Sequence, residues 1–300
     1  MSAPAYRCGY VALIGRPNVG KSTLLNHLLG QKISITSKRP QTTRHRILGI
    51  KTAATAQFVY VDTPGLHRYE GRAMNRHMNR EATRTLQEVD VVVFMVEGLR
   101  WTGDDDLVLK ELASTRCPVV LAVNKVDLIS DKQSLLPGLQ ELSGKGDFAQ
   151  IIPLSAVNGQ NVAELESVIE SLLPESAPFF PEDQITDRSE RFLVAERVRE
   201  KLFRKLGKEL PYGITVEIEH FRREGSIIHI HALIWVERQS QKSIVIGKQG
   251  RVLKEVGREA RAEIEPLLDS RVNLKLWVKV KEGWADDERA LRSLGYMGDD

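Results

Sequence analysis

The 300-residue sequence contains only two cysteines, Cys8 and Cys117, too few for a disulfide-stapled secreted fold. They form no closely spaced pair, so the sequence indicates neither a disulfide framework nor a cysteine-based zinc site. No apolar run approaches the ~18 residues that cross a bilayer, and residues 1–7 lack the apolar stretch of a signal peptide. These absences argue against membrane-spanning and exported proteins, and we expect a protein of the reducing cytoplasm.

An excess of charge of one sign is also missing. The 43 basic and 40 acidic residues leave a formal net charge of +3, so the overall charge does not by itself indicate a polyanionic partner. The hydrophobic fraction of 42% is sufficient for a core, and the length suggests about two domains. The local distribution of glycine and charge is therefore more informative than the average.

The strongest local pattern is the octapeptide GRPNVGKS at residues 15–22. The apolar run 10–14 precedes it and a helical pattern at 23–30 follows, so the sequence predicts a strand, a glycine loop and a helix. Glycines let backbone N–H groups approach phosphate oxygens, and the helix N-terminus adds partial positive charge. Lys21 supplies a charge for the outer phosphates, and Ser22 supplies a hydroxyl for Mg²⁺. The candidate phosphate-binding residues are Gly15, Asn18, Val19, Gly20, Lys21, Ser22 and Thr23.

A second pattern places a carboxylate at the end of a predicted strand. Residues 31–45 have the composition of a polar surface loop, and strands are predicted at 46–52 and 55–61. The second strand runs into the tetrapeptide DTPG at residues 62–65. Its aspartate, Asp62, can hold the Mg²⁺ shell, and we expect the N–H of Gly65 to contact a terminal phosphate.

Two later patterns indicate recognition of guanine. The tetrapeptide NKVD at residues 124–127 follows an apolar run, and its last carboxylate can accept both the N1–H and the N2–H₂ of guanine, which adenine cannot match. We expect the asparagine to brace the loops, the lysine stem to cover one face of the base, and the N–H of Ala156 to meet guanine O6. The candidate base-binding residues are Asn124, Lys125, Asp127, Ser155 and Ala156.

The alternation of strands and helices predicts a doubly wound α/β domain with a mostly parallel sheet, with every candidate loop at the C-terminal end of a strand. GRPNVGKS, Thr43, DTPG, NKVD and SA together resemble the motif series of translation-factor-related GTPases over roughly residues 8–175. The resemblance implies that the chain binds GTP and GDP and that Mg²⁺ is held by Ser22, Thr43 and, through water, Asp62. The catalytic candidates it implies are Asn18, Lys21, Thr43 and Gly65.

One residue departs from the pattern of many small GTPases. Leu66 stands where those proteins place the glutamine that orients the attacking water, and leucine cannot orient water. We therefore expect slow intrinsic hydrolysis of GTP to GDP and phosphate. In related GTPases with this substitution, an asparagine at the place of Asn18 helps to hold K⁺ beside the phosphates, so the resemblance implies K⁺ at Asn18.

The second half begins with a proline-rich stretch at 173–183 that predicts a linker. Residues 189–210 then predict a helix with one apolar face and several basic side chains. A basic amphipathic helix can lie on an anionic membrane, but a core helix with a solvated face is the favoured interpretation. Further on, His229 and His231 share a face of a predicted strand, where structural or partner-facing roles are favoured over metal binding.

A second glycine turn lies at residues 242–251, where a short apolar helix runs into Gly-Lys-Gln-Gly and a longer helix leaves it. A hairpin of strands at 214–222 and 227–236 precedes it, and an alternating strand at 272–280 follows. This order resembles the type II KH domain, whose glycine loop clamps a single-stranded backbone. Residues 242–281 hold ten Lys/Arg and five Asp/Glu, which suits an anionic partner. The candidate RNA-binding residues are Ile246, Gly247, Lys248, Gln249, Gly250 and Arg251.

These patterns predict a P-loop GTPase domain (1–175), a linker (176–188), a smaller α/β type II KH domain (189–283) and a tail (284–300). In the tail, Trp284 is expected to be exposed, either stacking on a base or capping the core.

The combination of the two domains resembles a bacterial family of GTPases of small ribosomal subunit assembly. That resemblance implies binding near the 3′ end of 16S rRNA, a role in 30S maturation, and a peripheral fraction at the inner membrane beside a cytoplasmic one. We expect a monomer in which GTP orders loops 31–45 and 65–85 and so controls RNA docking. The alternatives are a tRNA- or mRNA-directed GTPase, and a membrane-docked switch whose basic helix, 191–208, binds anionic lipid.

Overall fold

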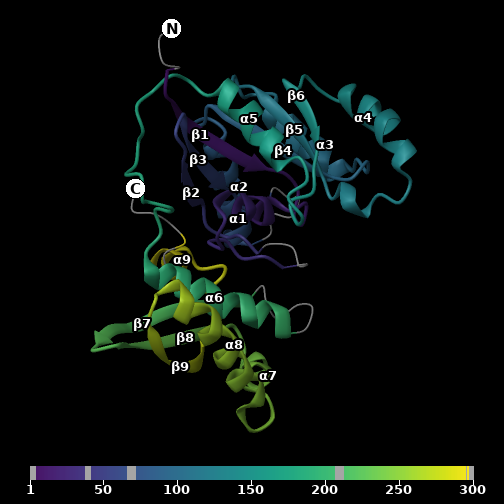
Figure 1. Cartoon of the computed structure of the whole chain (residues 1–300). Coiled ribbons are helices and arrows are strands. Elements are labelled where there is room, and N and C mark those ends of the chain that lie inside the picture. Colours follow the sequence, from purple (N-terminus) through teal and green to yellow (C-terminus); the bar gives the residue numbers. More distant parts are fainter. Residues whose placement is uncertain (1–4, 38–41, 66–71, 207–212, 295, 297–300) are drawn as a thin grey trace. The chain divides into compact units, whose positions relative to one another are not determined.

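The computed structural model describes residues 5–37, 42–65, 72–206, 213–294 and 296. The chain forms two compact units (Figure 1). One unit comprises Met1–Gly71 and Asn75–Asp187, and the other comprises Arg72–Met74 and Arg188–Asp300.

The first unit is built on a six-stranded sheet with the order β2-β3-β1-β4-β5-β6. Only the edge strand β2 is antiparallel to its neighbour, so the predicted mostly parallel α/β fold is confirmed. The central strands are buried on both faces, which explains why their sequences are nearly continuous apolar runs. The strands are β1 Arg7–Ile14, β2 Ile47–Thr52, β3 Ala56–Asp62, β4 Val91–Glu97, β5 Val119–Asn124 and β6 Gln150–Pro153.

Helices cover both faces of this sheet (Figure 1). A core of buried apolar side chains joins β1, β4 and β5 to α2, α3 and α4 on one face. Helices α1 and α5 lie against the other face, where Glu166 of α5 pairs with Lys51 of β2. The helices are α1 Lys21–Leu29, α2 Ala73–Thr85, α3 Gly103–Leu112, α4 Leu135–Ser143 and α5 Val162–Leu172, with short 3₁₀ turns at Val126–Leu128 and Lys132–Ser134.

The proline-rich segment after α5 lies along the edge of the sheet. Its Ile185 carbonyl accepts a hydrogen bond from the N–H of Ile50 in β2 over 2.7 Å, and Thr186 forms an antiparallel bridge with Gly49. Gln57 of β3 is buried beneath the segment, where its side chain accepts from the N–H groups of residues 179 and 180 and donates to the carbonyl of residue 180. These contacts occupy the edge strand β2, which would otherwise offer unpaired backbone groups.

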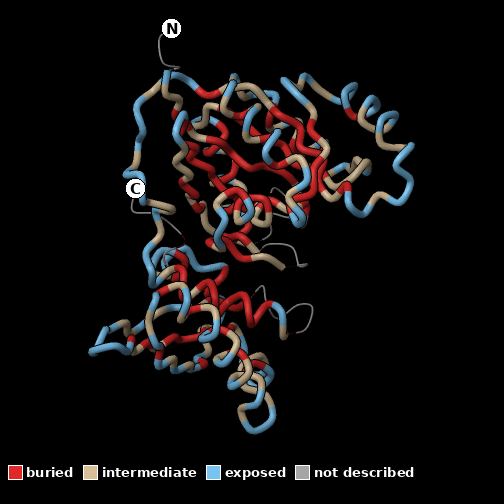
Figure 2. The backbone as a smooth tube through the Cα atoms, in the orientation of Figure 1, coloured by how far each residue is buried: buried red, intermediate tan, exposed pale blue. Residues whose placement is uncertain are grey.

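The second unit contains a three-stranded sheet, β7-β8-β9, in which β8 is antiparallel to β7 and parallel to β9. Alternate residues of β8 and β9 face the helices and form one core with α6 and α8, as the sequence alternation predicts. Figure 2 colours the backbone by burial, and buried residues occur in both units. The elements are α6 Glu190–Lys205, β7 Ile214–Glu224, β8 Ile227–Val236, α7 Gln239–Ile246, a 3₁₀ turn at Lys248–Gly250, α8 Arg251–Leu267, β9 Arg271–Val280 and α9 Glu288–Ser293.

Helix α6 begins at the side chain of Ser189, which accepts from the N–H of Phe192, and ends at Lys205; residues 207–210 of the predicted helix lie outside the described residues. Lys201 and Lys205 pair with acidic side chains of α8, whereas Arg199 and Arg204 pair with glutamates of α6 itself. Lys205 contacts Glu255 at 3.1 Å and Glu259 at 2.8 Å, and Lys201 contacts Glu263. The pairing favours the interpretation of this segment as a core helix rather than as a lipid-binding surface.

Two further expectations concern single residues. Trp284 is fully buried, not exposed, because its ring packs against Tyr296 and its Nε1–H donates to the Gly213 carbonyl over 3.2 Å. It caps the core of the second unit. His229 and His231 lie on the sheet face away from the helices, and no metal-binding cluster of three or more His, Cys, Asp or Glu occurs among the described residues. Within that same part of the chain, no helix is long and apolar enough to cross a membrane.

Candidate functional site

The first glycine loop connects β1 to α1, and its glycines are required by close contacts. A Cβ at Gly15 would lie 2.5 Å from the carbonyl oxygen of Met95, and one at Gly20 would lie 2.3 Å from Nδ2 of Asn124. Asn18 is exposed with a φ of 67°, and Val19 is fully buried. The loop thus packs tightly against β4 and the end of β5 and leads directly into the N-terminus of α1, which is the arrangement that binds phosphate.

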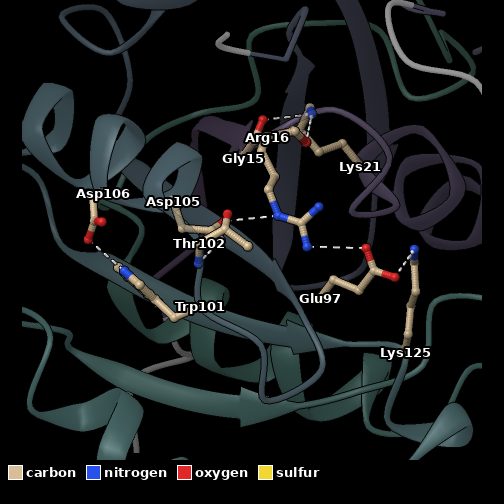
Figure 3. A network of polar contacts seen from close by, with 9 residues as sticks. All are labelled: Gly15, Arg16, Lys21, Glu97, Trp101, Thr102, Asp105, Asp106 and Lys125. Carbon is tan, nitrogen blue, oxygen red and sulfur yellow. Dashed lines mark hydrogen bonds and ion pairs between the residues drawn. The ribbon is translucent and has the colours of Figure 1, made fainter. Parts of the chain in front are cut away.

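Lys21 is curled inside this loop (Figure 3). Its Nζ donates to the carbonyls of Gly15 and Arg16 over 2.9 and 3.1 Å. Burial lowers the pKa of Lys21 to about 8, an effect that the carboxylate of Asp62 opposes and the charge of Arg16 increases. Among the described residues, the bonded partners of this buried cation are carbonyl oxygens and not a carboxylate, so the site favours a negatively charged ligand in the loop.

Side-chain oxygens from three segments converge beside the loop. Ser22 Oγ lies 2.8 Å from Oδ2 of Asp62 and 2.8 Å from Oγ1 of Thr43, and Thr43 Oγ1 lies 3.3 Å from the same carboxylate oxygen. Asp62 is fully buried at the end of β3; burial raises the pKa of its carboxyl, while Lys21 and the hydroxyl donors lower it. Its Oδ1 is buried without a hydrogen-bond partner in the described part of the chain.

A fourth hydroxyl in this cluster lies outside the sequence motifs. Ser34 is fully buried, and its Oγ donates to Asp62 Oδ2 over 2.7 Å. Asn26 of α1 holds the backbone of Ser34 through hydrogen bonds in both directions. The only sequence signals for this pair are an asparagine within the apolar helix pattern and a serine between two isoleucines.

Gly65 lies against the glycine loop. A Cβ at this position would lie 2.9 Å from the backbone nitrogen of Pro17 and 3.2 Å from Nζ of Lys21, so the DTPG turn lies against the glycine loop. Leu66, the residue predicted to slow hydrolysis, lies outside the described residues.

Asn124 connects the phosphate loop to the predicted base-binding loop. Its Nδ2 donates to the carbonyl of Val19 over 2.7 Å, and its Oδ1 accepts from the N–H of Ala156 over 2.9 Å. Ser155 is fully buried beside it, and Asp127 is exposed on the short 3₁₀ turn. The candidate base-binding residues therefore meet at the ends of β5 and β6.

A charged network fixes Lys125 (Figure 3). Its Nζ lies 2.9 Å from Glu97, and the same carboxylate lies 3.2 Å from Arg16 of the glycine loop. Although burial raises it, the pKa of the Glu97 carboxyl is held below its ordinary value by Lys125 and Arg16. Arg16 also contacts the fully buried Asp105 of α3 at 3.3 Å. The network thus ties the phosphate loop to the lysine expected to cover the base.

The second glycine turn lies between α7 and α8. Gly247 has a φ of 72° and Gly250 a φ of 75°, and a Cβ at Gly247 would lie 2.5 Å from Val252. Lys248 and Gln249 are exposed at its tip, and α8 begins at once with the exposed Arg251. The turn therefore presents backbone and basic side chains at a helix N-terminus, a suitable site for phosphates. Ile246, at the end of α7, is half-buried next to it.

Comparisons with known proteins agree with this arrangement. Residues 10–125 match the family model described as 50S ribosome-binding GTPase, and residues 209–285 match that of the KH domain. The chain is 60% identical to GTPase Era of Ectopseudomonas mendocina, covering 98% of this chain and 99% of that protein. It is 59% identical to GTPase Era of Marinobacter nauticus, covering 97% and 96%.

Two solved structures are similar over nearly the whole chain. One is a point variant of Aquifex aeolicus Era bound to GDP·AlF4⁻, with a TM-score of 0.92 and 39% identity over 97% of this chain and 99% of that chain. The other is Era in complex with MgGDPNP and nucleotides 1506–1542 of 16S ribosomal RNA, with a TM-score of 0.93 and 40% identity over the same shares. With these identities across both units, the chain belongs to the Era family of GTPases.

Proposed function

We propose that this GTPase is a guanine-nucleotide switch that binds the 3′ region of 16S rRNA through its KH domain and assists assembly of the 30S subunit. The observation that carries the proposal is the pairing, in one chain, of a complete phosphate and base site with the glycine turn between α7 and α8. The Era complex with MgGDPNP and 16S rRNA, which is 40% identical, supports both halves.

Mg²⁺ fits the oxygen cluster of the first unit. Ser22 and Thr43 supply hydroxyls and Asp62 a carboxylate, all of which are ligand types that Mg²⁺ prefers. The buried Asp62 Oδ1, without a hydrogen-bond partner among the described residues, is the acceptor expected for a water of the ion's shell. When bound, Mg²⁺ neutralises charge that develops on the phosphates.

The remaining residues bind and orient the nucleotide. In this proposal Lys21 and the N–H groups of the glycine loop hold the outer phosphates, and the N–H of Gly65 contacts the terminal one. Asp127 accepts from guanine, Lys125 covers the base, and Asn124 keeps Ala156 in reach of guanine O6.

We also propose that Asn18 helps to hold K⁺ beside the phosphates and that intrinsic hydrolysis is slow. The exposed position of Asn18 in the glycine loop, and leucine at position 66 in place of a water-orienting glutamine, support this. The test is the hydrolysis rate in Na⁺ and K⁺ buffers for the wild type and Asn18→Ala. Equal rates in both salts would contradict it.

GTP is proposed to control the arrangement of a GTPase domain (1–175) and a KH domain (189–283), joined by residues 176–188, with a tail at 284–300. Ordering of the loops that contain Thr43 and Gly65 would bias RNA docking, and by linkage RNA would tighten GTP binding to the same degree. We further propose a cytoplasmic monomer with a peripheral inner-membrane fraction. Because Lys201 and Lys205 of α6 pair with α8, we propose that this fraction uses another surface.

The experiment that tests RNA binding measures the affinity of a fluorescent oligonucleotide from the 3′ end of 16S rRNA by anisotropy. Lys248→Ala, at the tip of the second turn, should weaken RNA binding at least severalfold and leave GDP affinity unchanged. Lys110→Ala, an exposed lysine of α3, removes the same charge and should change neither. Equal losses in the two variants, or none, would contradict a role for the glycine turn.

A further inference from the structure

Ser34 differs from the other hydroxyl residues around Asp62 because a side chain of helix α1 holds its backbone. Asn26, on the helix that begins with Lys21, accepts from the N–H groups of Ile33 and Ser34 over 2.9 and 3.0 Å and donates to the Ser34 carbonyl over 2.9 Å. Ile33 and Ile35 are both buried on either side. The backbone of Ser34, in the same loop as Thr43, is therefore hydrogen-bonded directly to helix α1.

The contact of Ser34 is with one oxygen of the carboxylate. Its Oγ donates to Oδ2 of Asp62 over 2.7 Å, the same oxygen that Ser22 and Thr43 approach. Oδ1 is left buried and, within the described part of the chain, without a partner. A hydrogen bond from a fixed donor to one oxygen of a carboxylate orients the carboxylate plane and its second oxygen.

We propose that Ser34 is a positioning residue for the magnesium site, holding Asp62 so that Oδ1 faces the water shell of the ion with GTP and GDP alike. This rests on the proposed Mg²⁺ site of Ser22, Thr43 and Asp62. Ser34 lies in the loop 31–45, but its backbone is hydrogen-bonded to Asn26, which belongs to the same helix as Ser22. We therefore expect this end of the loop to keep its place with either nucleotide while the end that contains Thr43 reorders.

The test follows release of fluorescent GDP, and of a fluorescent non-hydrolysable GTP analogue, as free Mg²⁺ is varied. For Ser34→Ala, the Mg²⁺ concentration that half-maximally slows release should rise about tenfold with both nucleotides, the usual effect of removing an outer-shell partner. In EDTA the variant should release nucleotide at the wild-type rate. Cysteine is similar to serine in volume but is a weaker hydrogen-bond donor. The half-maximal Mg²⁺ concentration of Ser34→Cys should therefore lie between the values of the wild type and Ser34→Ala.

Two comparisons make the result specific. Thr43→Ala should shift the Mg²⁺ dependence with the GTP analogue far more than with GDP. Ser143→Ala removes a hydroxyl that donates within its own helix, to the Gln140 carbonyl, and should behave as wild type. Combining Ser34→Ala with Asp62→Ala should add nothing to Asp62→Ala alone, because Ser34 acts through that carboxylate.

An unchanged Mg²⁺ dependence in Ser34→Ala would overturn the proposal. So would release that is accelerated equally in EDTA and in Mg²⁺, since that pattern indicates a loosened loop rather than a displaced carboxylate. Release from the wild type that does not respond to Mg²⁺ would instead refute the underlying magnesium site. If Ser34→Ala does not fold, Ser34→Cys decides by the same criteria.

Discussion

Because Lys21 is buried, the stability of the nucleotide-free protein should depend on pH. Its pKa falls from 10.5 to about 8, chiefly through burial, whereas the unfolded chain keeps the ordinary value. Below pH 8 Lys21 is protonated in both the folded and the unfolded state, so the folded state bears the full free-energy cost of burying the charged ammonium group. This cost is about 3 kcal/mol, at about 1.36 kcal/mol per tenfold change in proton affinity. As the pH rises from 8 towards 10.5, the folded protein releases this proton before the unfolded chain does, so stability should increase.

The assay is urea unfolding of nucleotide-free wild type and Lys21→Met at a series of pH values. Other groups titrate in the same range, but they are common to both proteins and cancel in the difference. From about pH 7 to about pH 10, the free energy of unfolding of the wild type should gain about 2–3 kcal/mol relative to the variant. A difference that stays flat over this range would refute the reasoning that burial without a full anionic partner strains Lys21.

Three further changes have defined outcomes. Asn124→Ala leaves two buried backbone groups unpaired at about 1–3 kcal/mol each, so GDP affinity measured by equilibrium dialysis should fall at least tenfold; an unchanged affinity would count against its bracing role. Gly247→Val places a branched side chain at a φ of 72° against Val252, and RNA anisotropy should lose about tenfold in affinity with GDP binding intact. Gln57→Leu removes three hydrogen bonds to residues 179 and 180, so hydrogen exchange at these two amides should accelerate by about a hundredfold; protection like that of the wild type would contradict it.

The parts of the site that could be predicted are those with a recognisable motif in the local sequence. The glycine loop could be recognised because GRPNVGKS lies between a predicted strand and a predicted helix, although the contacts that require Gly15 and Gly20 are with Met95 and Asn124. Asp62 could be placed because the end of a buried strand in a parallel sheet is where a carboxylate meets the neighbouring loops. The type II KH order was readable because β9 alternates cleanly and two glycines flank the turn.

The parts that the sequence did not reveal depend on contacts between distant segments. Ser34 belongs to the site only because Asn26 turns its backbone towards Asp62, and neither residue type signals that contact. Trp284 lies among charged neighbours, so local composition predicted exposure, yet its ring fills the core beside Tyr296. Composition describes the neighbours along the chain, whereas burial depends on neighbours in space.

The structure of the proline-rich segment after α5 also depends on contacts with distant residues, and these contacts have a functional consequence. Its prolines are typical of a linker, but Ile185 and Thr186 pair with β2, whose first residue, Ile47, follows Thr43 by four positions. The chain then reaches α6 within a few residues. If Thr43 reorders with the nucleotide as proposed, a shift of β2 would reach the start of α6 through these backbone hydrogen bonds. Because Gln57 holds the same segment on β3, the strand that ends in Asp62, both β2 and β3 are hydrogen-bonded to the segment that leads to the second unit.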